Sequence, residues 1–205
     1  MDKIIVTNIF AAVSDKSVLD PLLGVLDSTS ARFWGTEGTV QHLQQKGFSA
    51  KSVVAGFDFD GRVKSLDKLT FARILADRTN RKHLNELERL SHVILSKSEE
   101  SQRSFGQPQD DSEPFDLVIV DLYPLDEKNF PESMDIGGQA LIRAAIKNYK
   151  NVALAFDKES IGDLVSEIRK NNGSISLQFR KSQAKKSARF ISKRCNLELR
   201  LITKI

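Results

Sequence analysis

Short runs of apolar residues recur along the chain with few polar residues inside them. Such runs are typical of strands buried on both faces, as in a parallel sheet. They lie at residues 4–6, 31–34, 52–54, 117–120 and 152–156. The pattern therefore predicts a mainly parallel sheet of about five strands.

Between these runs, apolar residues return every three or four positions, which indicates amphipathic helices. The first stripe lies at 18–26, and we expect Pro21 in the first turn of that helix. Further stripes lie at residues 40–45, 71–90, 137–149, 161–168 and 179–191. Alternating strands and helices predict a three-layer, doubly wound α/β fold. We expect residues 1–205 to form a single domain and Lys97–Glu113 to be a polar surface loop.

Length and composition restrict the class of protein. The chain has 205 residues, of which 40% are hydrophobic and 28% charged, as in soluble globular proteins. No apolar run approaches the roughly 20 residues of a membrane helix. A single cysteine, Cys195, and three scattered histidines argue against a disulfide or a metal centre. We therefore expect a cytoplasmic protein without a metal ion.

The net charge of +4 is distributed unevenly. From Arg180 onward there are nine basic residues and one acidic residue, so this end carries +8 and the remainder −4. A basic end can bind nucleic acid, or it can be the solvated face of a terminal helix. The segment lacks the interleaved aromatic residues that stack on bases. We therefore favour a basic C-terminal helix over nucleic-acid binding.

Ligands of doubly wound folds bind at the carboxyl ends of the strands, so the residues after each strand are candidates. Ser14 and Lys16 follow the first strand, where they can cap a helix or hold an anion, and on these residues alone we favour the cap. The turn at 35–39, Gly-Thr-Glu-Gly-Thr, can bind a phosphate through N–H and hydroxyl groups. Glu37 would repel a phosphate there. An ordinary glycine-rich turn explains these residues equally well.

The third strand is followed by two cations at alternating positions, Arg62 and Lys64, with Ser65 beside them. In extended backbone the two cations face the same side, where they suit a phosphate or a developing oxyanion. On these residues alone, we favour the other interpretation, a basic loop in solvent.

Two further candidates lie near the fourth strand. Tyr123 precedes a proline that restricts its backbone, and Asp135 precedes a predicted helix, where it can serve as N-cap. Lys147 lies twelve residues beyond Asp135, or about 18 Å along a straight helix. The two can share a site only if that helix begins late or is interrupted.

Six motifs occur in the order found in a known family. Together they resemble the IMP cyclohydrolase domain of the bifunctional purine-biosynthesis protein, which has a methylglyoxal-synthase-like fold. They lie at residues 14–16, 35–39, 61–66, 122–124, 135–138 and 143–148. The resemblance covers nearly the whole chain and ends where the formyltransferase half of that protein would begin.

The resemblance implies a hydrolase-class enzyme of purine biosynthesis. Formylated aminoimidazole carboxamide ribonucleotide, a purine nucleotide precursor, would be closed to IMP with loss of water. The family uses no metal and no organic cofactor for this step. The resemblance also implies a homodimer. From the residues themselves we expect no membrane partner and consider a nucleic-acid partner unfavoured.

The site residues implied by the resemblance fall into two groups. Positions that match the catalytic group are Lys64, Tyr123, Asp135 and Lys147. Positions that match phosphate or substrate binding are Ser14, Lys16, Thr36, Gly38, Thr39, Arg62, Ser65 and Gly137. We assign proton transfer to Asp135 and Lys147, and oxyanion stabilisation to Lys64 and Tyr123.

The chain also departs from the family pattern. Glu37 replaces a glycine, Asp67 and Phe71 replace two histidines, and Asp121 replaces an asparagine. The segments 55–60 and 124–135 are shorter than in the family. Three of these changes add carboxylates near a pocket for an anionic nucleotide. The first hypothesis is thus an IMP cyclohydrolase, and the alternative is a nucleotide-binding or regulatory relative with reduced catalysis.

Overall fold

A five-stranded parallel sheet forms the centre of the molecule in the computed structural model, which describes residues 2–53, 67–98 and 112–204. Its strand order is β4-β3-β2-β5-β6. The strands are β2 (Asn8–Ala12), β3 (Arg32–Gly35), β4 (Ser49–Ser52), β5 (Leu117–Val120) and β6 (Ala153–Ala155). The predicted parallel sheet of about five strands is confirmed.

The first apolar run does not belong to this sheet. Strand β1 (Lys3–Ile5) pairs antiparallel with β7 (Ser174–Ser176), with Ile4 opposite Ile175. The first run has one buried face only, since Ile4 is buried and Ile5 is 68% exposed. The central strand is instead β2, which the sequence analysis missed because it opens on Asn8 and ends on two alanines.

The helices lie in the predicted alternation, with shifted bounds. They are η1 (Lys16–Leu19), α1 (Asp20–Leu23), α2 (Glu37–Gln45), α3 (Lys68–Leu75), α4 (Arg81–Ser98), η2 (Glu127–Asn129), α5 (Ile136–Lys147), α6 (Lys158–Lys170) and α7 (Leu177–Ile202). The stripe at 18–26 forms only a 3₁₀ turn and one short helix, in which Pro21 lies near the N-terminus as expected. The stripe at 71–90 divides between α3 and α4.

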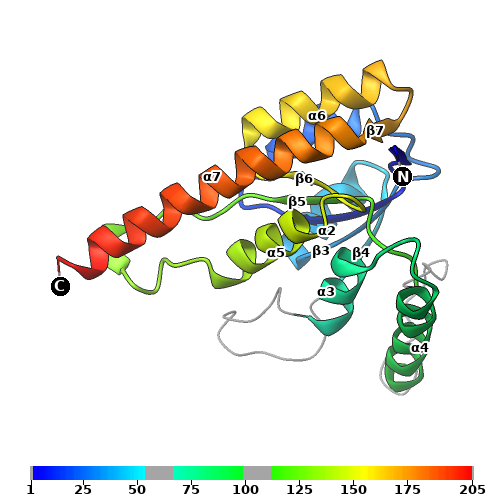
Figure 1. Cartoon of the computed structure of the whole chain (residues 1–205), viewed down its shortest axis with the longest axis horizontal. Helices are drawn as coiled ribbons and strands as arrows, with labels where there is room; N and C mark the ends of the chain where they lie inside the picture. Colours follow the sequence, from blue (N-terminus) through cyan, green and yellow to red (C-terminus); the bar gives the residue numbers. More distant parts are fainter. Residues whose placement is uncertain (1, 54–66, 99–111, 205) are drawn as a thin grey trace.

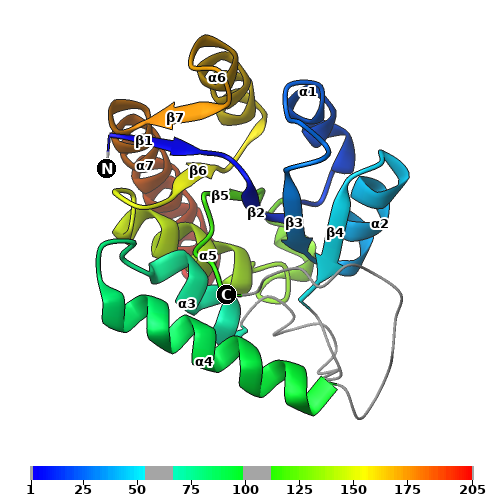
Figure 2. The same cartoon turned by 90° about the vertical axis from the view of Figure 1, so that its right-hand side faces the viewer.

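Alternate residues of each strand enter two separate cores, which makes the domain three-layered. In β2, Ile9 and Ala11 join the core beneath α1, α2 and α6. Phe10, on the opposite face, joins the core beneath α3, α5 and α7. Figure 2 shows the two groups of helices on either side of the sheet. The three-layer α/β architecture is therefore confirmed.

Helix α7 is the longest element and runs along the molecule to the C-terminus (Figure 1). Arg180 near its start is buried and donates hydrogen bonds to the carbonyl oxygens of Ile175, Tyr149 and Lys150. Ile191 is buried in the core over β6. The basic C-terminal segment is thus a packed helix, as predicted.

None of the helices in the three described ranges is both long enough and apolar enough to span a bilayer.

Candidate functional site

A cavity of about 1070 Å³ lies at the carboxyl ends of the central strands. Its walls come from the residues after β2, the first turn of α2, the residues after β5, the 123–135 segment and the first turn of α5. This is the edge of the sheet where doubly wound folds bind ligands. The predicted site residues among its walls are Ser14, Lys16, Thr36, Gly38, Tyr123, Asp135 and Gly137.

Three predicted residues, Arg62, Lys64 and Ser65, lie outside the described residues. Their placement in the site therefore stays a prediction.

The turn between β3 and α2 is shaped by a glycine that the parallel sheet requires. A Cβ atom on Gly35 would lie 2.0 Å from the carbonyl oxygen of Ala11 on β2. Beyond it, Thr36 takes the N-cap position of α2, and its hydroxyl lies 3.2 Å from that of the buried Thr39. Thr39 thus supports the turn from beneath, while the N-terminus of α2 opens on the cavity at Glu37 and Gly38.

Lys16 links this turn to the end of β2. Its Nζ donates a hydrogen bond of 2.8 Å to the carbonyl oxygen of Ser14. Its Cε would lie 3.5 Å from a Cβ atom on Gly38, so the side chain passes directly over that glycine. The ammonium group is thereby held beside the N-terminus of α2, where a cation and helix N–H groups together favour an anion.

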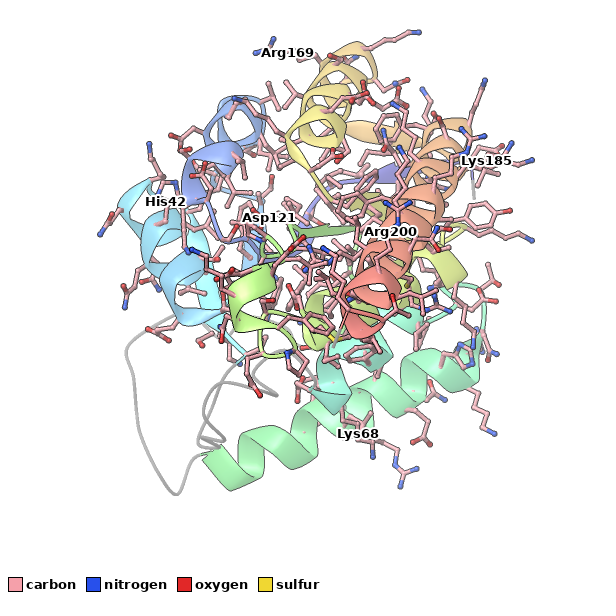
Figure 3. All side chains as sticks on the ribbon, turned by 90° about the vertical axis from the view of Figure 1, so that its left-hand side faces the viewer. His42, Lys68, Asp121, Arg169, Lys185 and Arg200 are labelled. Carbon is pink, nitrogen blue, oxygen red and sulfur yellow. The ribbon has the colours of Figure 1, made fainter. Side chains whose placement is uncertain are left out.

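Asp121 occupies the space between the ends of β2 and β5. The main-chain N–H of Ser14 donates to Asp121 Oδ1, and the Ser14 hydroxyl donates to Oδ2 at 2.8 Å. The N–H of Asp15 lies 3.5 Å from the same Oδ2. Figure 3 shows Asp121 near the middle of this end of the molecule, between α2 with His42 and the last turns of α7 with Arg200. Asp121, which the sequence analysis named only as a difference from the family pattern, is therefore part of the site.

Asp135 is the N-cap of α5, and its carboxylate accepts a hydrogen bond of 2.7 Å from the N–H of Gly138. The N–H of Tyr123 lies 3.5 Å from its other oxygen. Burial raises the pKa of the Asp135 carboxyl above its ordinary value. The two N–H groups and the positive charge of Arg194 act in the opposite direction, and the charge of Asp121 raises the pKa further. A carboxyl group with a raised pKa suits general acid–base chemistry.

The lack of a side chain at Gly138 leaves room for the Asp135 carboxylate. A Cβ atom there would lie 2.6 Å from Asp135 Oδ2 and 2.6 Å from Leu122 Cδ2. Both side chains are half buried and would have to shift to admit a methyl group. The close approach of Asp135 therefore favours glycine at this position of the motif.

Tyr123 lies at the mouth of the cavity and is 60% exposed. Its ring is therefore accessible to a ligand, while its main chain is fixed toward Asp135.

Lys147 does not reach this cavity. Helix α5 is uninterrupted from Ile136 to Lys147, so the condition under which Asp135 and Lys147 could share a site is not met. The two residues lie at opposite ends of the helix, about 18 Å apart at its rise per residue. The structure thus brings Tyr123 and Asp135 together but leaves Lys147 exposed and outside the site of its own chain. A catalytic role for Lys147 stays a prediction.

Helix α7 supports the site from behind, through two residues that the sequence analysis counted only as charges. Glu198 accepts a hydrogen bond of 2.7 Å from the side chain of Gln139 on α5. Arg194 donates to Glu198 at 3.3 Å and lies 3.5 Å from the carbonyl oxygen of Ser133. The four-residue spacing of Arg194 and Glu198 was the available signal, because such pairs meet on one helix face.

The cavity lining is acidic. Among the lining residues that the structure describes, Lys16 is the single cation. The lining carboxylates are Glu37, Asp121, Asp126, Glu132 and Asp135. Asp67, the remaining carboxylate among the departures from the family pattern, is not in the lining. It caps α3 by accepting a hydrogen bond from the N–H of Thr70. In the described part of the chain, no three histidine, cysteine or carboxylate side chains gather as metal ligands do.

Comparison with known proteins relates this chain to part of a purine-biosynthesis protein. The chain is 33% identical over 188 residues to the bifunctional purine biosynthesis protein PurH of Brucella anthropi, a match that covers 86% of this chain. The PurH proteins of Clostridium botulinum and Rhodopirellula baltica are also 33% identical, over 187 and 185 residues. The chain spans about one third of the length of these relatives.

A solved structure shares the fold. The crystal structure of ForH superposes with a TM-score of 0.73 and 24% identity, covering 97% of each chain. No protein-family model matches the chain. The PurH matches confirm the resemblance carried by the six motifs, and the chain is a homologue of the N-terminal third of the bifunctional purine biosynthesis protein PurH.

Proposed function

We propose that this protein is an IMP cyclohydrolase, which closes formylated aminoimidazole carboxamide ribonucleotide to IMP. The observation that carries the proposal is Asp135, a half-buried carboxyl with a raised pKa beside Tyr123 in the strand-end cavity of a PurH homologue. The homology supports a purine-nucleotide precursor as ligand, and the acid–base residue supports a reaction that moves protons.

The reaction needs little beyond positioning and proton transfer. The carboxamide nitrogen attacks the formyl carbon of the same molecule and gives up one of its two protons, while the formyl oxygen takes up a proton. The resulting hydroxyl then leaves as water, as the former formamide nitrogen loses its proton and a C=N bond forms. Holding the two substituents together contributes by orientation, as in other intramolecular reactions.

Asp135 is suited to the first proton transfer. Its raised pKa makes it a better proton acceptor than an ordinary carboxylate, and the Gly138 N–H keeps one oxygen fixed. Tyr123, which lines the cavity and is exposed, would donate a hydrogen bond to oxygen on the reacting carbon. The resemblance adds Lys64 as an oxyanion stabiliser, and Arg62 and Ser65 as substrate contacts.

Substrate binding would use the cation and the helix terminus on the opposite wall. Lys16 and the first turn of α2 form the positive end of this cavity, with the Thr36 hydroxyl at its edge. The homodimer implied by the resemblance also stays a prediction, which light scattering of the purified protein would test.

The test is a direct assay of ring closure. Purified protein is mixed with the formylated carboxamide ribonucleotide, and IMP is followed over time for wild type, Asp135→Asn and the control Asp126→Asn. We expect Asp135→Asn to reduce kcat roughly a hundredfold or more, since general acid–base groups contribute about that much. Asp126 is an exposed lining carboxylate, and its variant should stay near wild type. Wild-type turnover by Asp135→Asn contradicts the assignment.

A nucleotide-binding relative without turnover is the second candidate. It is favoured by the five lining carboxylates, which oppose one lysine among the described residues and weaken the field that attracts an anionic substrate. A flat trace in the assay, together with IMP binding measured by calorimetry, would select this candidate.

A further inference from the structure

The end of β2 forms a small anion cradle that this chain fills itself. Three donors converge there on one carboxylate, namely the N–H and hydroxyl of Ser14 and the N–H of Asp15, and that carboxylate is Asp121. Consecutive main-chain N–H groups at a strand end are a common phosphate-binding arrangement. The cradle therefore has the chemistry to hold a phosphate but is occupied from within.

The sheet register places Asp121 in the cradle. Strands β2 and β5 pair in parallel with Ala12 opposite Val120, so the residue after Val120 lies beside the residues that follow Ala12. Asp121 reaches the Ser14 donors without leaving the end of its strand. Its position is consequently set by the core of the sheet rather than by a surface loop.

A phosphate in this cradle would have to replace Asp121. The displaced carboxylate would remain at the cavity wall, next to the phosphate and near the carboxylate of Asp135, to which it already couples. Like charges a few ångströms apart repel strongly in a partly buried site. Lys16 does not compensate inside the cradle, because its ammonium group is held on the carbonyl side of Ser14.

We propose that Asp121 is a specificity-determining residue that closes the cradle after β2 to phosphate. A phosphate that binds in this cavity must then use its other anion site, which is formed by Lys16 and the first turn of α2. The proposal rests on the proposed function only in taking this cavity as the ligand site, and its test requires no turnover.

The experiment titrates inorganic phosphate into wild type, Asp121→Asn and the control Asp126→Asn by calorimetry at fixed ionic strength. Asp121→Asn keeps the shape and removes the charge, so we expect phosphate to bind at least about tenfold tighter than to wild type. Asp126→Asn removes the same charge from the same cavity but not from the cradle, and should gain less than about threefold. An equal gain in both variants overturns the proposal, as does no gain in Asp121→Asn.

Two further measurements test the origin of the gain and provide a second variant if Asp121→Asn folds poorly. Adding Ser14→Ala to Asp121→Asn removes one cradle donor and should cancel most of the gain. In Asp121→Ser, which also lacks the charge, the ratio of the IMP affinity to the inosine affinity should exceed the wild-type ratio by at least about tenfold, because only IMP carries the phosphate. A smaller rise overturns the proposal. Absence of ring closure with these binding results intact would count against the proposed function alone.

Discussion

The environment of a single carboxyl group determines what this site can do. Asp135 caps α5, is half buried and accepts main-chain hydrogen bonds, so its charge is opposed by desolvation and favoured by its donors. Desolvation is the larger effect, and the pKa is raised. Asp135 thus serves both as the N-cap of α5 and as the proposed acid–base group, and experiments can separate these two roles.

The pH dependence of stability provides one such separation. A raised pKa means that the folded state holds the Asp135 proton more tightly than the unfolded state does. The stabilisation is therefore fully present below the unfolded pKa of about 3.9 and is lost as pH rises through the higher folded pKa. We expect the stability difference between wild type and Asp135→Asn, measured by urea unfolding, to fall over this window. A difference independent of pH would contradict the raised pKa.

The pH dependence of catalysis tests the same group differently. If Asp135 accepts the proton, kcat/KM should rise with pH through its raised pKa, giving an acid limb centred above the ordinary carboxyl value of about 3.9. The residual activity of Asp135→Asn should lack this limb. A limb that persists in the variant would assign it to another group.

Gly138 is the second residue-scale test. Gly138→Ala would force a methyl group against Asp135 and Leu122, and we expect a loss of about 1–3 kcal/mol in unfolding free energy together with a lower kcat. Gly162→Ala on the exposed side of α6 meets no neighbouring atom and is the matched control. It should be neutral or stabilising by up to about 1 kcal/mol. Equal effects of the two variants would show that Asp135 needs no glycine beneath it.

Among the elements, α7 does more than carry charge. Of the nine basic residues from Arg180 onward, four bond other groups of the protein and so are part of its packing rather than of a free basic tail. They are Arg180 with three carbonyl oxygens, Lys186 with Asp163, Arg194 with Glu198, and Lys204 with Glu127. These contacts favour the interpretation of a terminal helix over that of a nucleic-acid-binding arm.

A pair of substitutions in α7 checks this interpretation. Ile191→Ala removes a buried side chain from the core over β6 and should reduce the unfolding free energy by about 2–5 kcal/mol. Leu199→Ala, at a position 59% exposed on the same helix, should change it by less than about 0.5 kcal/mol. The comparison is made by chemical denaturation. Similar small effects at both positions would indicate that α7 is not part of the folded core.

At the scale of the molecule, the sequence predicted those features of the fold and of the site that depend on short stretches of the chain. Strands β3, β5 and β6 were recognisable because both of their faces are largely apolar, and the strand-end rule collected Ser14, the 35–39 turn, Tyr123 and Asp135 at one edge. The polar edge strand β4 was placed three residues late, and β2 was missed, since neither has a continuous apolar run.

Long-range register explains what else could not be predicted. Ser14 and Asp121 are 107 positions apart, and only the pairing of β2 with β5 brings them together. The separation of Asp135 from Lys147 likewise depends on α5 being continuous, which the spacing of its residues left open. Charge counting could not reveal that Arg194 and Glu198 belong to the support of the site, because their partners lie on other elements.

The two ends of the chain lie at opposite ends of the molecule, and this has a practical consequence for the experiments above. The N-terminal strand β1 pairs with β7 in the small antiparallel sheet. At the other end of the molecule (Figure 1), Lys204 forms an ion pair with Glu127 in the segment that borders the cavity. A purification tag or an attached fluorophore at the N-terminus would therefore leave the cavity rim undisturbed. The same addition at the C-terminus would sit beside the 123–135 segment, where it would alter the very affinities that the titrations are designed to compare.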